Sequence, residues 1–124
     1  MKELEGLNKA ASGINKANAE KGFYDEKREI GTLLMLCVSE LAEALEADRK
    51  DEYAELENFH VNVKSFGFKN SFESCIKDTF EDEIADTVIR LLDLCGHLKV
   101  DIEQHVKLKL EYNAKRPNKH GKKY

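Results

Sequence analysis

The chain lacks tryptophan and has a single proline, Pro117, among its 124 residues. With so little proline, a helix can run uninterrupted through most of the sequence. No apolar run approaches the roughly 20 residues that cross a bilayer, which argues against a transmembrane helix. The first five residues include two acids, Glu3 and Glu5, and lead into no apolar segment, so we expect no secretory signal and a cytoplasmic location.

Cysteine is also scarce. Cys37, Cys75 and Cys95 are odd in number and show no CxxC spacing. This excludes a complete disulfide framework and a zinc ribbon. Each cysteine stands among apolar residues, and we interpret the three as small core residues in a reducing compartment.

Basic residues are fewer than acidic ones, 20 against 24, and are unevenly placed. Residues 1–113 carry a net charge of −9, whereas residues 114–124 hold five basic residues and no acid. An acidic body disfavours a nucleic-acid-binding surface. We predict a single helical domain over 1–113, which carries the functional site, and a basic C-terminal tail over 114–124 that could serve as a basic arm.

Apolar residues recur at intervals of three and four, a pattern typical of amphipathic helices. It predicts an all-α protein, a four-helix antiparallel bundle completed by oligomerisation. We expect a first helix ending at Gly22, a second from about Glu26 to Arg49, a third from an N-cap at Ser71 to Cys95 with Gly96 as its stop, and a fourth from Asp101 to before Pro117. Residues 51–58 could form a short helix, and residues 60–70 are predicted to be a loop.

Two of these helices have a clear apolar stripe that we expect to be buried. In the second helix the stripe is Ile30, Leu33, Leu34, Cys37, Leu41 and Leu45. In the third it is Phe80, Ile84, Val88, Leu91 and Cys95. Packing these stripes together would form the core of the bundle.

Each of the same two helices also carries a pair of acids three residues apart. Glu40 and Glu43 lie in the second helix, and Glu83 and Asp86 in the third, within segments that match position by position. Three-residue spacing places each pair on one helix face. At about 100° per residue both pairs fall on the same flank of their stripe, so the four carboxylates can surround one cleft.

Four crowded carboxylates repel one another unless a cation joins them. Since no histidine or cysteine accompanies them, the hard cations Mg²⁺ or Mn²⁺ fit best. Two such ions can activate water and clamp the oxygens of a phosphoryl group. A single ExxE pair usually lies on a solvated helix face, and the duplication of the pair is what favours a metal site.

A ferritin-like carboxylate site is an alternative. It needs the Glu-x-x-His motif twice, and the motif occurs once, at Glu57 and His60.

These residues resemble the MazG-like all-α nucleotide pyrophosphohydrolases. The resemblance rests on Glu40-x-x-Glu43 followed by Glu83-x-x-Asp86 in apolar helices. It extends through residues 28–31 and 81–86 and, near the C-terminus, through Tyr112-Asn113, Arg116-Pro117 and residues 119–124, which are similar to a small single-domain branch. The gap between the two pairs is longer than usual, and we place the extra residues in 60–70.

The resemblance implies hydrolysis of a nucleoside triphosphate between the α and β phosphates, which yields a monophosphate and pyrophosphate. It further implies Mg²⁺ held by Glu40, Glu43, Glu83 and Asp86, and assembly into dimers or tetramers. Glu43 is also our candidate for the catalytic base. Arg90, one turn after Asp86, is either an ion-pair partner or a phosphate contact.

Substrate contacts are expected nearer the ends of the chain. Lys109 and Asn113 resemble the family's phosphate-contacting pair, and they share one helix face. Arg116 and Lys119 could close over the phosphates, or they could belong to a solubilising tail. Tyr24, where relatives often carry tryptophan, could stack on the base or plug the end of the bundle.

Two other functions stay open at this point. One is a non-catalytic helical module that binds a nucleotide or a partner protein without turning it over. The other is a nucleic-acid binder that acts through the basic tail, which the acidic body disfavours.

Overall fold

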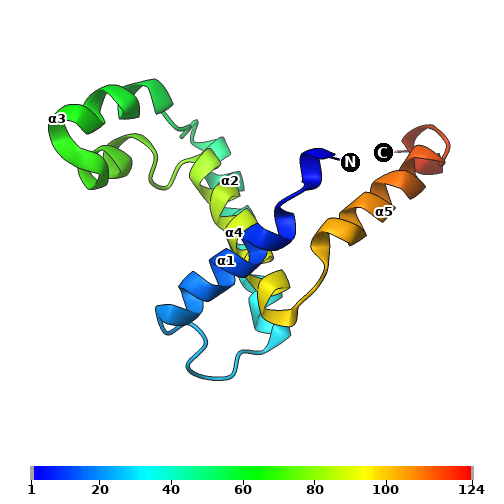
Figure 1. Ribbon diagram of the computed structural model, residues 1–124. Helices are drawn as coiled ribbons and strands as arrows, with labels where there is room; N and C mark the ends of the chain where they lie inside the picture. Colours follow the sequence, from blue (N-terminus) through cyan, green and yellow to red (C-terminus); the bar gives the residue numbers. More distant parts are fainter. Residues whose placement is uncertain (1, 124) are drawn as a thin grey trace. The chain divides into compact units, whose positions relative to one another are not determined.

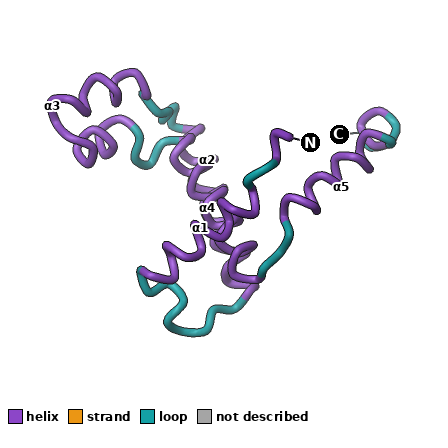
Figure 2. Tube along the Cα trace, in the orientation of Figure 1, coloured by secondary structure: helices purple, strands orange, loops and turns teal. Residues whose placement is uncertain are grey.

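The computed structural model describes residues 2–123, and within them the regular structure is entirely helical, without a strand (Figures 1 and 2). The all-α class predicted from the sequence is confirmed. The α-helices are α1 (Leu7–Glu20), α2 (Ile30–Arg49), α3 (Leu56–Cys75), α4 (Phe80–Leu98) and α5 (Ile102–Ala114). Short 3₁₀ helices cover Lys2–Leu4 and Asn118–Gly121.

The chain divides into two compact units, which we describe separately. One unit, residues 27–91, contains α2, α3 and the first part of α4. The other combines the residues up to Glu26 with those from Leu92 onwards, and contains α1, the end of α4 and α5.

In the second of these units, α1 and α5 cap each other's N-termini. The carboxylate Oε1 of Glu103 accepts hydrogen bonds from the backbone N–H groups of Gly6 (2.8 Å) and Asn8 (3.3 Å). In return, Asn8 Oδ1 accepts from the N–H of Glu103 at 3.2 Å. The predicted N-cap at Asp101 is confirmed, since its Oδ1 accepts from the N–H of Gln104 at 3.1 Å. These bonds satisfy backbone donors that a helix start leaves unpaired.

The segment between the two acidic pairs differs most from the prediction. Residues 60–70, predicted as a loop, belong to α3, which is interrupted only where Gly67 adopts φ 80° and ψ 170°. Ser71 is not an N-cap, because it lies inside α3 and is 1% exposed. Our periodicity analysis missed this helix because its apolar residues do not follow one stripe.

The helix that carries Glu83 is therefore shorter at its start and longer at its end than predicted. It begins after Thr79, whose Oγ1 accepts a hydrogen bond from the N–H of Asp82 at 3.3 Å. Gly96 does not stop it, because α4 continues to Leu98. Instead Gly96 allows a close approach to α1: a Cβ there would lie 2.4 Å from the carbonyl oxygen of Ala11.

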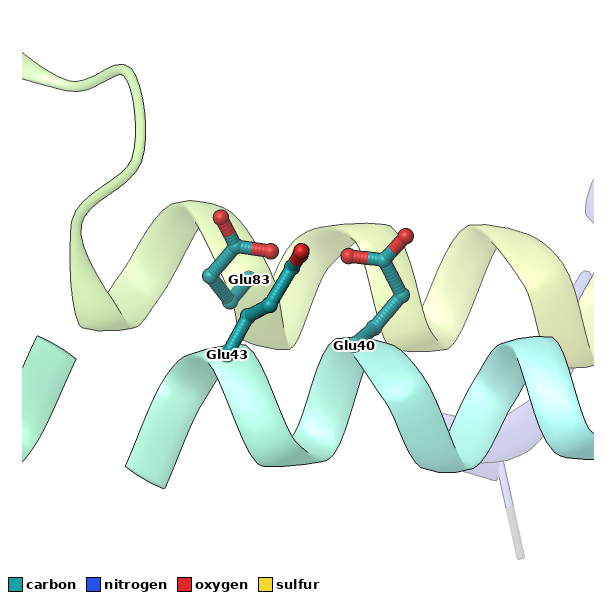
Figure 3. Close-up of side chains that lie close together, drawn as sticks. All are labelled: Glu40, Glu43 and Glu83. Atoms are coloured by element: carbon teal, nitrogen blue, oxygen red, sulfur yellow. The ribbon is translucent and has the colours of Figure 1, made fainter. Parts of the chain in front are cut away.

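Helices α2 and α4 run antiparallel in the residue 27–91 unit and meet along a seam (Figure 3). The predicted burial of Leu33 and Cys37 is confirmed, but the rest of the seam lies one position before the predicted stripes. The buried side chains are Leu33, Cys37, Glu40, Ala44 and Ala47 in α2, with Glu83 and Thr87 in α4. Other members of the stripes that we expected to be buried are 37–50% exposed: Ile30, Leu34, Leu41, Leu45, Ile84, Val88 and Leu91.

A one-residue offset rotates each helix by about 100° about its axis. The offset has the same direction along the sequence in both helices, and the two helices are antiparallel. The rotation therefore places the exposed apolar residues of both helices on one side of the pair. The prediction was wrong here because it assumed that the most apolar arc is buried within the chain. Small residues, such as Ala44 and Thr87, line the seam instead. No helix among the described residues is both long and apolar enough to span a membrane.

Candidate metal centre

Three carboxylates from α2 and α4 converge at the seam of the residue 27–91 unit. Oxygens of Glu40, Glu43 and Glu83 all lie within 4.8 Å of one another. Figure 3 shows Glu40 and Glu43 rising from α2 towards Glu83 on α4. The structure thus brings together three of the four acids predicted to form a site, and we call these three residues the acid trio.

Two members of the acid trio are removed from solvent. Glu40 is 8% exposed and Glu83 is 5% exposed, whereas Glu43 is exposed. The buried Oε2 of Glu83 has no hydrogen-bond partner. A buried acceptor without a partner is costly, and in native proteins such an atom usually marks strain, catalysis or a missing ion or water.

The pKa values of the two buried acids are shifted in opposite directions. Burial, together with the neighbouring Glu40 and Glu43 side chains, raises the pKa of Glu83 to about 8. Burial also raises the pKa of Glu40, but hydrogen bonds with Glu83 and Arg90 outweigh it and hold that pKa below its ordinary value. Without a cation, Glu83 therefore retains a proton at neutral pH, and Glu40 carries the charge.

After Glu83, Arg90 is the next group that lowers the pKa of Glu40. Its Nε donates a hydrogen bond to Glu40 Oε1 at 2.9 Å, and its side chain is 38% exposed. The sequence left two roles open for Arg90, ion-pair partner and phosphate contact. The contact with Glu40 is that of an ion-pair partner.

Asp86 is not a member of the acid trio. It lies one turn after Glu83 on α4 and is half-buried. Burial raises its pKa, and the negative charges of Asp82, Glu40 and Glu43 raise it further. Asp86 therefore belongs to the same electrostatic environment, although its oxygens do not complete the four-carboxylate cluster.

The acid trio has the chemistry that a hard divalent cation requires. Mg²⁺ binds oxygen ligands at about 2.0–2.1 Å, so ligand oxygens around one ion lie about 3–4 Å apart. Three oxygens within 4.8 Å of one another need only a small contraction to reach that spacing. The partnerless Oε2 of Glu83 gives such a cation an oxygen that no other group satisfies. These residues therefore fit the cation implied by the family resemblance.

A second acidic group, which sequence reasoning missed, adjoins the first. Oxygens of Asp78, Asp82 and Glu83 also lie within 4.8 Å of one another. A cavity of about 340 Å³ is lined by Glu43, Glu46, Ala47, Glu52, Asp78 and Glu83. The signal available in the sequence was the density of acids over residues 78–86, which the search for three-residue spacing ignored.

Tyr24, predicted to contact the substrate, lies in the other unit and has several neighbours there. Its hydroxyl donates to Asp93 Oδ2 at 2.8 Å, and Asn15 Nδ2 donates to the other carboxylate oxygen at 3.0 Å. Its ring stacks on His97 with a centroid separation of 4.2 Å. The described contacts of Tyr24 are therefore those of a packed residue.

The remaining predicted substrate contacts also lie in that unit, around a residue that the prediction overlooked. The ring of Tyr112 has Lys109 Nζ at 5.2 Å and Arg116 Cζ at 5.5 Å from its centroid. Asn113 is half-buried, and its Oδ1 has no hydrogen-bond partner. Lys119 is exposed, with φ 55°. Tyr112 thus gathers two of the predicted cations by cation–π contact.

Comparisons of the chain with protein-family models, curated proteins and solved structures found no match.

Proposed function

We propose that the protein is a Mg²⁺-dependent nucleotide pyrophosphohydrolase of the MazG-like type, which cleaves a nucleoside triphosphate between the α and β phosphates. The observation that carries the proposal is the buried carboxylate of Glu83, with a partnerless oxygen and two further carboxylates within 4.8 Å. A solvated surface pair would show neither the burial nor the convergence. Mn²⁺ is an alternative cation, and the cytoplasm is the expected location.

In this proposal Glu40, Glu43 and Glu83 hold the cation, and Asp86 joins them when it binds. A bound divalent cation polarises phosphoryl oxygens and lowers the pKa of water, which supplies a nucleophile at neutral pH. Glu43 is the exposed member of the acid trio and the candidate base, because solvent and substrate can reach it. Hydrogen bonds with Glu83 and Arg90 lower the pKa of Glu40, which leaves this carboxylate ready to bind a cation.

The phosphates need positive charge beyond the cation. We assign Lys109, Asn113, Arg116 and Lys119 to this role. The cation–π contacts of Lys109 and Arg116 with Tyr112 support the assignment, since they hold two cationic side chains beside one ring. Tyr24 remains a candidate for contacting the base, although its ring already stacks on His97.

We further propose that a second copy of the chain covers the exposed apolar side of α2 and α4 and completes a four-helix bundle. The helix surface carries Ile30, Leu34, Met35, Val38, Leu41 and Leu45 on α2, at 47–63% exposure, with Ile84, Val88 and Leu91 on α4. An apolar patch of this kind marks an interface in a water-soluble protein. Glu43 and Asp86, one position before the seam residues Ala44 and Thr87, fall on the opposite side, so pairing would leave the acids accessible.

The runner-up is a helical module that binds a nucleotide or a partner protein without catalysis. Two observations favour it: Asp86 is not part of the acid trio, and Tyr24 is held by Asp93 and His97. Tight nucleotide binding in calorimetry, together with no turnover, would support this function instead.

The decisive test is a product assay over a panel of ribo- and deoxyribonucleoside triphosphates with Mg²⁺. We expect equal amounts of monophosphate and pyrophosphate, and no products once a chelator removes the metal. Release of orthophosphate, or turnover that persists without a divalent cation, would refute the proposal. The same panel would establish the preferred base and sugar.

A further inference from the structure

The acidic group at the start of α4 has a feature that surface acids lack. Asp78 is exposed and Asp82 is half-buried, but the third member, Glu83, is 5% exposed. An oxygen of Glu83 lies within 4.8 Å of oxygens of both aspartates. Because Glu83 Oε2 is buried and has no partner, this group contains an acceptor that the protein itself leaves unsatisfied.

Glu83 belongs to both acidic groups, and a single cavity joins them. The cavity of about 340 Å³ is lined by Glu43 and Glu83 from the acid trio and by Asp78 from the second group. In Figure 3 one oxygen of Glu83 points towards Glu43 and the other points away from it. A carboxylate with two diverging oxygens can bridge two cations.

The backbone around Asp78 is held in place by bonds that do not involve its side chain. Its N–H donates to Asp82 Oδ2 at 2.9 Å, and the N–H of Phe80 donates to the carbonyl oxygen of Glu52 at 2.8 Å. Thr79, which follows Asp78, is 8% exposed and donates its hydroxyl to the carbonyl oxygen of Ile76. Asp78 is thus fixed at the cavity without its carboxylate being consumed in these contacts.

Charge also matches two cations better than one. Glu40, Glu43, Glu83, Asp78 and Asp82 together carry five negative charges when ionised, and Arg90 contributes one positive charge. With the neighbouring Asp86 included, the net charge is −5, of which two divalent ions neutralise four charges. One ion would leave three charges uncompensated in a partly buried cavity, which is unfavourable.

We infer that Asp78, Asp82 and Glu83 form a second divalent-cation position, with Glu83 shared between this position and the acid trio. The inference rests on the proposed function to the extent that Glu83 is a ligand of both ions. Asp78 and Asp82 are not part of the two acidic pairs on which the family resemblance depends.

The test is a titration of the full-length protein with Mn²⁺, in which electron paramagnetic resonance measures the free ion. Wild type is expected to bind two Mn²⁺ per chain, and Asp78→Asn only one. Asparagine suits this position because Asp78 has φ 63°, a region that asparagine tolerates well. The matched control is Asp51→Asn: Asp51 has φ 55°, is exposed in the same unit and belongs to neither acidic group, so two ions should still bind.

Glu43→Gln separates this inference from the proposed function. If both are right, Glu43→Gln retains one ion, and that ion is lost when Asp78→Asn is added. If Mn²⁺ binding is unaffected by Glu43→Gln but falls with Asp78→Asn, the second position stands and the acid trio is not a metal site. Equal binding by wild type and Asp78→Asn, or no binding by wild type, would overturn the inference.

Discussion

Arg90 donates a hydrogen bond to Glu40 at 2.9 Å across the seam between α2 and α4, and no other ion pair among the described residues joins these two helices. Together with the hydrogen bond from Glu83, it holds the pKa of Glu40 below its ordinary value, whereas burial raises the pKa of Glu83 to about 8.

Arg90→Met should destabilise the metal-free protein by about 1–2 kcal/mol, because Glu40 would be left buried without its positive partner. The partial exposure of Arg90 keeps the value below that of a fully buried pair. Urea unfolding measures the change. Arg49→Met is the control, since Arg49 pairs with the exposed Glu46 at 3.7 Å and should contribute almost nothing. Equal effects of the two substitutions would argue against a special role for the buried pair.

The stability of the metal-free protein should fall as pH rises towards about 8. Between the ordinary glutamate value of 4.5 and about 8, native Glu83 holds a proton that the unfolded chain has released. The free energy of unfolding then decreases with pH, by at most about 1.4 kcal/mol per pH unit for one proton. Urea unfolding between pH 6 and 7.5 measures this slope.

Glu83→Gln should abolish that slope, because glutamine stays neutral in both states. Glu46→Gln, at an exposed position of α2, should preserve it. Saturating Mg²⁺ should reverse the slope, since the cation binds the deprotonated carboxylate and its affinity rises with pH. A flat profile for the metal-free wild type would show that Glu83 is already ionised.

Glu43→Gln and Asp86→Asn should each reduce turnover by about 100-fold or more while the helical circular dichroism spectrum is retained. Both substitutions remove a charge with little change in shape, and neither side chain is fully buried. Asp48→Asn on α2 serves as the control and should retain activity. Collapse of the helical signal in both variants would instead mean that these acids are structural.

Leu41→Glu should shift the protein from dimer to monomer in size-exclusion chromatography with light scattering. Leu41 lies on the exposed apolar side of α2 and is 48% exposed. A charge buried between two copies would be strongly unfavourable. Phe66→Glu on α3, at a residue that is 65% exposed, should leave the dimer intact. A wild-type monomer would contradict the proposed pairing.

Gly96→Ala should destabilise the protein by about 1–3 kcal/mol, because the added methyl group would overlap the backbone of α1. Gly13→Ala is the matched control. A Cβ at Gly13 meets nothing within 4 Å, so alanine should stabilise α1 by about 0.5–1 kcal/mol through its helix propensity. Thermal unfolding of both variants tests the close packing of α1 and α4.

Local signals predicted the helical class and several boundaries well. The end of α2 at Arg49 and the N-cap at Asp101 followed from spacing and capping chemistry alone. Three of the four acids also converge as their spacing indicated. These features depend on interactions within a few residues, which a single sequence expresses directly.

Features that depend on packing between helices were not predictable in this way. Hydrophobicity alone did not predict which residues of α2 face α4. Leu34 and Leu41 are more apolar than Ala44, yet Ala44 is buried and the two leucines are exposed. Gly96 was interpreted as a helix stop, whereas its function is a close contact with Ala11 in α1. The position of Asp78 beside Asp82 and Glu83 depends on a turn that no periodic pattern describes.

Glu43 and Asp86 lie on the side of α2 and α4 opposite the exposed apolar residues, and this separation affects which substitutions the protein can accept. Substitutions that erase the carboxylates leave the apolar side unchanged, and the reverse holds as well. The proposed catalysis and the proposed self-association would therefore depend on separate surfaces, so that either one could be lost by substitution while the other is kept.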